Sequence, residues 1–277
     1  MLLSSTSRSV DLSHPQIMGI LNLTPDSFSD GGRFSSPHVA LKHAKQMLAD
    51  GATFIDVGGE STRPGADEVA EQQELDRVIP VIELLRQELD CWISIDTSKA
   101  VVMKEAVRAG ADLINDICAL REPNALQVAA DSGAAICLMH MQGLPRTMQQ
   151  APDYADVTAE VITFLADRVQ SCRAAGISDE RLCLDPGYGF GKGLAHNYEL
   201  LGKLKHLHQL GLPLLVGMSR KSMLGQLLGR EVDERLAGSL AAHLFAVNQG
   251  AHILRVHDVK EMADALRVWQ HAAQYQI

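Results

Sequence analysis

The sequence is poor in the residues and patterns that mark several protein classes. It has five cysteines in 277 residues, none in a CxxC pair, and only 4% aromatic residues. No stretch approaches the roughly 18 consecutive apolar residues of a membrane span, and the N-terminus lacks the apolar core of a signal peptide. We therefore expect reduced thiols, no membrane partner and a cytoplasmic location.

Basic residues are also in the minority, with 25 Lys and Arg against 34 Asp and Glu and a net charge of −9. Nucleic acids and anionic membranes attract basic surfaces, so neither is expected as a partner. An anionic small substrate would need a local cluster of cations. The eleven histidines form no HExxH, and no HxH at the end of the first apolar run, which argues against a metal hydrolase.

The chain does contain a repeated pattern of glycines followed by apolar runs. Six amphipathic stretches end at a glycine, the residue favoured just beyond a helix, and an apolar run follows each: Gly51, Gly110, Gly133, Gly176, Gly211 and Gly250. Two further runs begin at Gln16 and Cys91. Short runs without clean alternation are typical of strands buried on both faces.

Eight such runs separated by helical periods predict parallel βα units. A (β/α)₈ barrel needs about 250 residues, and no linker or composition break divides this chain. We therefore predict an α/β protein with one domain over residues 1–277, a (β/α)₈ TIM barrel. A doubly wound open sheet is the alternative.

Polar side chains recur where the eight runs end, and the carboxyl ends of barrel strands carry the active site. Asp56 and Asp96, taken singly, could instead cap the turn or helix that follows. Together the polar strand ends favour one functional site: Asn22, Asp56, Asp96, Asn115, Met139 with His140, Asp185, Ser219 with Lys221, and Arg255 with His257.

The segment LDPGYGFGK, residues 184–192, has the glycines and lysine of a phosphate-binding loop but not the spacing. The pattern G-x-x-x-x-G-K-[ST] would need glycine at Pro186 and a hydroxyl residue at Gly193. Asp185 is the more plausible functional group, because a carboxylate pairs with the N–H fork of a pterin or a guanine. Asn115 could complement the adjoining ring edge, while the glycines let the backbone pass close beneath a flat ligand.

Two polar loops and two cationic segments complete the candidate site. NLTPDSFSDGG from Asn22 and GGESTRPGADE from Gly58 are rich in Gly, Ser, Asp and Pro, although ordinary surface connections have the same composition. SRKS, residues 219–222, lies at a strand-to-helix junction, a favourable place for an anion. RVHD, residues 255–258, ends the last run.

Seven segments resemble, in order, the signature segments of bacterial dihydropteroate synthases: ILNLTPDSFSDGG, DVGGESTRPG, ISIDTS, INDI, DPGYGFGK, SRKS and RVHD. They are spread over essentially the whole chain. The resemblance implies a (β/α)₈ barrel that joins 6-hydroxymethyl-7,8-dihydropterin diphosphate to p-aminobenzoate, which sulfonamides mimic. Two small departures are Leu23, where valine is common, and Tyr188, where isoleucine is common.

The resemblance also implies a role for each matching residue. The pterin would contact Asp96, Asn115, Ile117, Met139, Asp185, Phe190, Gly217, Lys221 and Arg255. The diphosphate would bind Asn22, Thr62, Arg63, Arg255 and His257, with Mg²⁺ on Asn22. The p-aminobenzoate would contact Phe28, Pro64, Ser219, Lys221 and Ser222. Catalysis would depend on Asp30, Arg63, Lys221, Arg255 and His257.

The implied reaction is a dissociative substitution, in which the C–O bond breaks before the arylamine captures the pterin cation, and the implied assembly is a homodimer. Two alternatives share the pterin pocket: a pterin-binding methyltransferase barrel and a non-catalytic pterin-binding paralogue. Neither would need both polar loops and SRKS, and Asn22, Arg63 and SRKS are all present.

Overall fold

The fold is a closed barrel of eight parallel strands. The structure, a computed structural model, describes residues 1–23, 37–60, 69–143, 148 and 152–275. In these ranges the parallel strands follow the order β8-β7-β6-β5-β4-β3-β10-β9. An isolated parallel bridge between Leu184 and Leu214 joins β8 to the segment that leads into β9, and the Leu184 amide donates to the carbonyl of Pro213 at 2.8 Å. The predicted barrel is confirmed, and the open sheet is wrong.

Each of the eight predicted apolar runs forms a strand. The strands are β3 Gln16–Asn22, β4 Phe54–Gly58, β5 Trp92–Asp96, β6 Leu113–Asp116, β7 Ala135–Met139, β8 Leu182–Asp185, β9 Leu215–Val216 and β10 Ile253–Val256. The helices are α1 Pro37–Ala49, α2 Glu71–Glu88, α3 Ala100–Ala109, α4 Ala125–Ser132, α5 Val157–Ala174, α6 Leu194–Gly202, α7 Ser222–Leu228, α8 Leu236–Asn248 and α9 Val259–Ala273. The described ranges also contain the 3₁₀ helices η2 Asp179–Arg181, η3 Leu204–Leu210 and η4 Val232–Glu234.

Glycine ends the helical stretches where the sequence predicts it. All six predicted glycines have a positive φ, from 71° at Gly133 to 117° at Gly110. Side chains other than glycine rarely adopt this conformation, so glycine stops the helix and turns the chain toward the next strand.

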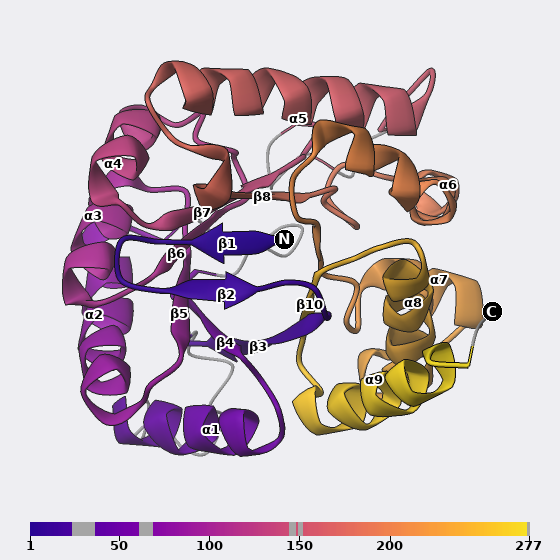
Figure 1. Cartoon of the computed structure of the whole chain (residues 1–277), viewed down its shortest axis with the longest axis horizontal. Helices are drawn as coiled ribbons and strands as arrows, with labels where there is room; N and C mark the ends of the chain where they lie inside the picture. The colour runs from indigo at the N-terminus through magenta and orange to yellow at the C-terminus, as the bar shows by residue number, and fades with distance from the viewer. Residues whose placement is uncertain (24–36, 61–68, 144–147, 149–151, 276–277) are drawn as a thin grey trace.

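A hairpin that the sequence did not predict covers the amino end of the barrel. Its strands, β1 Leu2–Ser4 and β2 Ser9–Asp11, pair antiparallel and lie across the centre of the view in Figure 1. The hairpin residue Leu3 and the following Leu12 are buried against strand residues that include Phe54 and Trp92. This end of the barrel is therefore an apolar plug, and a polar site has to lie at the opposite end.

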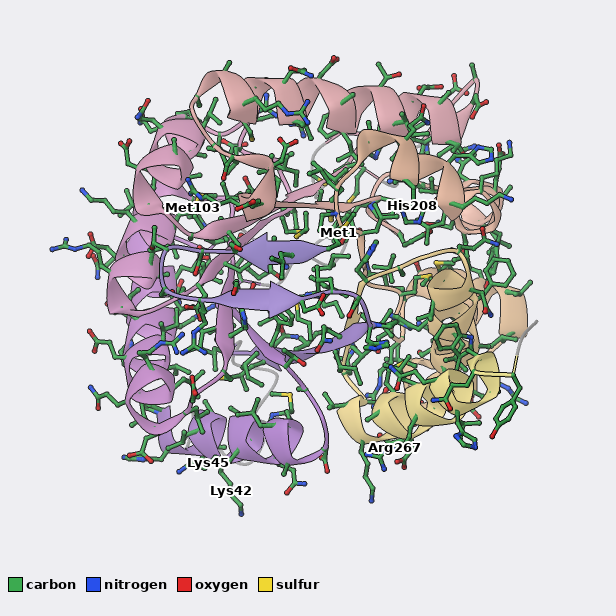
Figure 2. All side chains as sticks on the ribbon, viewed as in Figure 1. Met1, Lys42, Lys45, Met103, His208 and Arg267 are labelled. Carbon is green, nitrogen blue, oxygen red and sulfur yellow. The ribbon has the colours of Figure 1, made fainter. Side chains whose placement is uncertain are left out.

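Alternation along the strands separates the core from the site. Residues such as Ile55, Val57 and Ile93 face the helices in one large apolar cluster, because successive strand residues point to opposite faces of a sheet. Phe54 and Trp92 point into the barrel near its amino end, and the inward residues beyond them become polar. Buried side chains fill the interior, so the barrel is a packed core and not a pore. Figure 2 draws the described side chains on the ribbon.

All five cysteines are buried free thiols. None of the helices in the described ranges has the length and apolar character needed to span a bilayer.

Candidate active site

Two buried carboxylates hold the arginine of the last strand. Arg255 on β10 donates from Nε to Oδ2 of Asp56 at 2.6 Å and from Nη2 to Oδ2 of Asp96 at 2.7 Å. Asp56 is fully buried on β4, and Asp96 ends β5 with 8% of its surface exposed. The Nδ2 of Asn115, on β6, donates to the same Asp56 oxygen at 3.3 Å. Residues from four strands therefore meet at the carboxyl end of the barrel, as the strand-end pattern predicts.

Asp185 and Lys221 lie near this group, since the charges of Asp185, Arg255 and Asp96 all act on Lys221. Asp185 ends β8, is 5% exposed, and accepts a hydrogen bond from the Gly187 amide at 2.7 Å. Lys221, just before α7, donates to the carbonyl of Tyr188 at 2.7 Å, and its Nζ lies 4.6 Å from the centre of the Phe190 ring. The loop after β8 therefore positions both the predicted carboxylate and the predicted lysine.

A small apolar cluster lies at the same end of the barrel. It contains all three apolar residues predicted to line the pterin slot, Ile117, Met139 and Phe190, together with Cys118, Met141 and Met148. Gly217 lies beside the arginine: a Cβ built on it would be 3.6 Å from Cβ of Arg255. Apolar walls beside a few convergent polar groups are typical of a small-molecule site.

Burial changes the charge balance among these groups. It raises the pKa of Asp96 to about 7, although the Arg255 cation opposes the shift and the Asp56 charge adds to it. Burial likewise raises the pKa of Asp185, against the effect of Lys221, and lowers the pKa of Lys221 to about 8, against the effect of Asp185. Burial would lower the pKa of Arg255, but Asp56 and Asp96 raise it above its usual value, so this side chain remains a cation.

The glycines of the β8 loop are required by a close approach to another loop. Gly187 and Gly191 have φ of 70° and 59°, and a Cβ on them would lie 1.9 Å and 2.4 Å from the main-chain oxygens of His140 and Gln142. The sequence led us to expect an approach to a flat ligand. The contact shown here is with the loop after β7.

Lys192 is not a phosphate ligand, because protein acceptors surround its ammonium. With 2% of its surface exposed, it donates to the carbonyls of Gly187 at 2.8 Å and Phe190 at 3.0 Å. Its Nζ also lies 2.9 Å from Nδ1 of His140. Burial and the Lys192 charge lower the pKa of His140 to about 2, so the ring is neutral and Nδ1 accepts. Its donors are therefore directed at protein groups of the loops after β7 and β8.

The cationic segments divide into two groups. The Oγ of Ser219 lies 3.0 Å from Nδ1 of His257 and accepts the His257 amide at 3.2 Å, so these two predicted residues meet. Arg220 instead pairs with Asp258, with Nε 3.0 Å from Oδ2. Ser222 is exposed and begins α7.

Several predicted residues lie outside the described ranges, namely Phe28, Asp30, Thr62, Arg63 and Pro64. Asn22 is described: it ends β3, and its Oδ1 would lie 3.5 Å from a Cβ built on Gly58 at the end of β4. In the part of the chain that the structure covers, no three His, Cys, Asp or Glu side chains form a metal-binding group.

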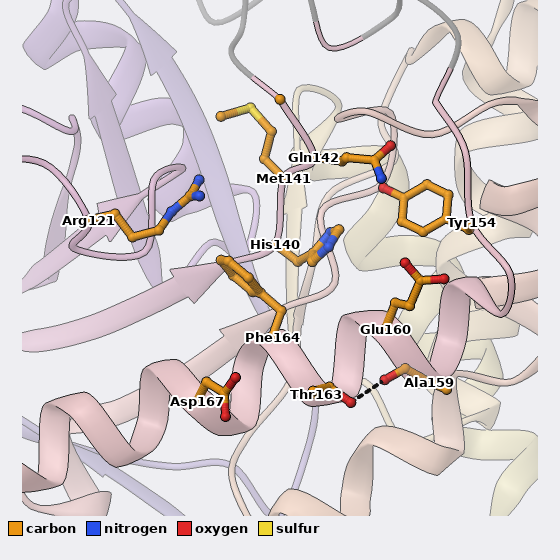
Figure 3. A pocket seen from close by; sticks show the side chains of 11 residues that line it. Arg121, His140, Met141, Gln142, Tyr154, Ala159, Glu160, Thr163, Phe164 and Asp167 are labelled. Carbon is orange, nitrogen blue, oxygen red and sulfur yellow. Dashed lines mark hydrogen bonds between the residues drawn. The ribbon is translucent and has the colours of Figure 1, made fainter.

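A pocket of about 570 Å³ lies outside the barrel mouth, between the loop after β7 and α5 (Figure 3). Its lining includes Arg121, His140, Tyr154, Glu160 and Asp167, which Figure 3 shows around the cavity. None of the pterin residues predicted from the sequence lines it. Its size alone therefore does not make it the substrate site.

Sequence reasoning left out two residues that support the site. Asp56 was noted as a strand-end carboxylate but was given no role. Its position in the strand could have identified it: Asp56 lies two positions before the end of β4, so it faces inward like Gly58. Lys192 was considered only as a phosphate ligand. Nothing in its spacing identifies the carbonyls that surround it.

Comparison with known proteins identifies this arrangement. A family model described as a pterin binding enzyme matches residues 18–257. The dihydropteroate synthase of Escherichia coli K12 is 59% identical over 268 residues, which cover 97% of this chain and 95% of the relative. That of Haemophilus influenzae is 56% identical and covers 99% of both chains.

Solved structures agree with these relatives. A Yersinia pestis dihydropteroate synthase with a sulfonamide drug complex superposes with a TM-score of 0.95 at 55% identity, covering 99% of this chain and 100% of the other. A Xanthomonas albilineans dihydropteroate synthase with 4-aminobenzoic acid gives a TM-score of 0.94 at 49% identity, covering 100% and 99%.

The fold and the site thus define a pterin-binding barrel enzyme. More narrowly, the chain belongs to the dihydropteroate synthase family, and it is a transferase of that kind. The methyltransferase barrel and the non-catalytic paralogue receive no support from these comparisons.

Proposed function

We propose that this transferase binds 6-hydroxymethyl-7,8-dihydropterin diphosphate at the carboxyl end of the barrel and joins it to p-aminobenzoate. The observation that carries the proposal is the convergence of Asp185, Asn115, Lys221 and Arg255 beside an apolar wall. Two of these groups are cations, and Asp185 and Asn115 offer acceptors and a donor. This set is complementary to a flat ring with a mixed hydrogen-bonding edge.

The pterin would lie between the apolar cluster and the guanidinium plane of Arg255. Asp185 would accept two parallel N–H bonds from the amino-pyrimidine edge, the geometry that a carboxylate favours. Lys221 would donate to the ring carbonyl, and its position over Phe190 would keep it directed at the slot. Asp96, whose pKa burial raises to about 7, would face the reduced ring.

The diphosphate would lie toward Asn22 and His257, with Thr62 and Arg63 as further ligands. Asn22 fits a Mg²⁺ that keeps most of its water and phosphate ligands, because such sites use only one or two protein oxygens. Bound there, Mg²⁺ would neutralise charge on the departing diphosphate. Ser219 would orient the imidazole of His257 through their contact.

The reaction would be dissociative. The C–O bond to the diphosphate breaks, the electron-rich dihydropterin delocalises the positive charge at its methylene, and the neutral arylamine forms the new C–N bond and then releases a proton. The chain stabilises the leaving diphosphate and positions the amine against Phe28, Pro64 and Ser222. Asp30 would accept the proton late, so no strong base is required.

A homodimer in the cytoplasm is part of the same proposal. Leu227 and Leu228 on α7 and Phe245 on α8 are 57%, 47% and 46% exposed, and such apolar residues are suited to contact with a second copy. Light scattering of the purified protein would test the dimer, and cell fractionation would test the location.

Diphosphate release tests the function. Purified protein, Mg²⁺ and the pterin diphosphate are incubated with and without p-aminobenzoate, and the product is identified by mass. Release that requires p-aminobenzoate and gives dihydropteroate is the expected result. Pterin binding without any release would contradict the proposed reaction.

To test the dissociative step, p-aminobenzoate is replaced by arylamines of different basicity. A dissociative reaction gives nearly equal turnover with all of them, whereas turnover that rises steeply with basicity contradicts it.

A further inference from the structure

Asp56 supports the site but belongs to no substrate contact proposed above. It is fully buried inside the barrel, and one of its oxygens, Oδ2, accepts hydrogen bonds from both Arg255 and Asn115. Its other oxygen, Oδ1, is buried and has no partner among the described residues. A buried carboxylate that satisfies two donors while leaving an oxygen unpaired costs folding free energy. Its position is therefore better explained by the donors that it holds.

The bond to Arg255 sets the plane of the guanidinium. The Asp56 carboxylate holds Nε, and the Asp96 carboxylate holds Nη2. Two held points on a rigid planar guanidinium fix its tilt. Ring stacking depends on that tilt. With Nε and one N–H of Nη2 engaged, Arg255 offers its flat face and its remaining N–H groups on Nη1 and Nη2 to a ligand.

The bond to Asn115 sets the orientation of an amide. Because Nδ2 donates to Asp56, the amide oxygen is directed elsewhere, and it remains an acceptor for a ligand N–H. An Asn without this anchor could turn over and present its donor instead. One carboxylate oxygen thus fixes both the stacking cation and the hydrogen-bonding polarity of the ring edge.

We propose that Asp56 is a positioning residue of the pterin site, which aligns the Arg255 guanidinium and the Asn115 amide through a shared oxygen. The inference rests on the proposed function, in which these two side chains contact the pterin. Asp56 itself need not touch the substrate. Its loss therefore weakens pterin binding and turnover while leaving the KM for p-aminobenzoate unchanged.

The test compares Asp56→Asn and Asp56→Ala with the wild type, using calorimetric titration with 6-hydroxymethylpterin and steady-state kinetics. Asp56→Ala should weaken pterin binding by about 10- to 100-fold, because two buried donors lose their acceptor, and Asp56→Asn by less, because its amide oxygen can still accept. The control is Asp112→Asn: Asp112 is also buried, but it lies directly before β6 at the amino end of the barrel, where it accepts the Ile93 amide and pairs with Arg86. The control should lower stability with pterin affinity nearly unchanged.

A double-mutant cycle separates positioning from a general loss of stability. In an Arg255→Met background, Asp56→Asn should reduce affinity at least about threefold less than it does in the wild type, because the group that it positions is gone. Equal effects in the two backgrounds, or a matching rise in the KM for p-aminobenzoate, would overturn the proposal. If Arg255→Met and Asn115→Ala both bind pterin normally, the proposed function fails as well.

Discussion

Replacing Lys192 with methionine tests whether its ammonium holds the β8 loop in place. Methionine has a similar length and no donor, so the carbonyls of Gly187 and Phe190, now bonded at 2.8 and 3.0 Å, would lose their partner. A buried acceptor left unpaired costs about 1–3 kcal/mol. The ammonium no longer has to be desolvated, which offsets part of the loss, so we expect Lys192→Met to reduce the free energy of unfolding by about 2–4 kcal/mol.

Urea unfolding followed by circular dichroism measures this change, and titration with 6-hydroxymethylpterin measures its effect on the site. We expect pterin affinity to fall as well, because the same loop carries the Gly187 amide that Asp185 accepts and the Tyr188 carbonyl that Lys221 binds. Lys203→Met is the control, because Lys203 is an exposed lysine whose ammonium bonds to Glu199 one turn earlier in the chain. If Lys192→Met unfolds at the same urea concentration as the control and binds pterin normally, the loop does not depend on Lys192.

Three further predictions follow from other parts of the structure. Both Gly187 and Gly176 have positive φ, but of the two only Gly187 would place a Cβ 1.9 Å from a main-chain oxygen. Gly187→Ala should therefore destabilise the protein far more than Gly176→Ala, and equal urea midpoints would contradict this. Leu3→Ala should reduce the free energy of unfolding by about 2–4 kcal/mol, because Leu3 is fully buried in the barrel plug. Leu2 is 54% exposed, so Leu2→Ala should leave the urea midpoint nearly unchanged. Pterin affinity should fall as the pH rises through about 8, because Lys221 then loses the proton that it donates. Calorimetry should find no such decline for Lys221→Arg, because an arginine keeps its charge at this pH.

The barrel could be predicted because its strands are buried on both faces and its helices end at glycine. The weakest strand shows the limit of that reasoning: the run PLLVGMS forms a regular strand only over Leu215–Val216. The Leu214 amide donates to the His252 side chain, a contact that no pattern in the run predicts. The hairpin escaped prediction because its strands have three residues each. Such short segments contain too few residues for a twofold alternation to be recognised.

The site could be predicted residue by residue but not as a network. Strand ends identify Asp96, Asn115 and Asp185 because all carboxyl ends of a parallel barrel meet at one mouth. Asp56 is 199 positions away from Arg255 in the chain, and no spacing rule connects the two residues. The roles assigned to residues in the two loops after β3 and β4 stay predictions.

The central claim is that the pterin binds at the barrel mouth and not in the 570 Å³ pocket beside α5. Titration with 6-hydroxymethylpterin of the wild type, Asp185→Asn and Asp167→Asn tests this claim directly, because each variant neutralises one carboxylate in one of the two places. We predict at least about tenfold weaker binding to Asp185→Asn, because its amide has a single acceptor oxygen and turns an NH2 group toward one of the two parallel N–H donors. Binding to Asp167→Asn should be unchanged. Weakened binding to Asp167→Asn with normal binding to Asp185→Asn would contradict the account.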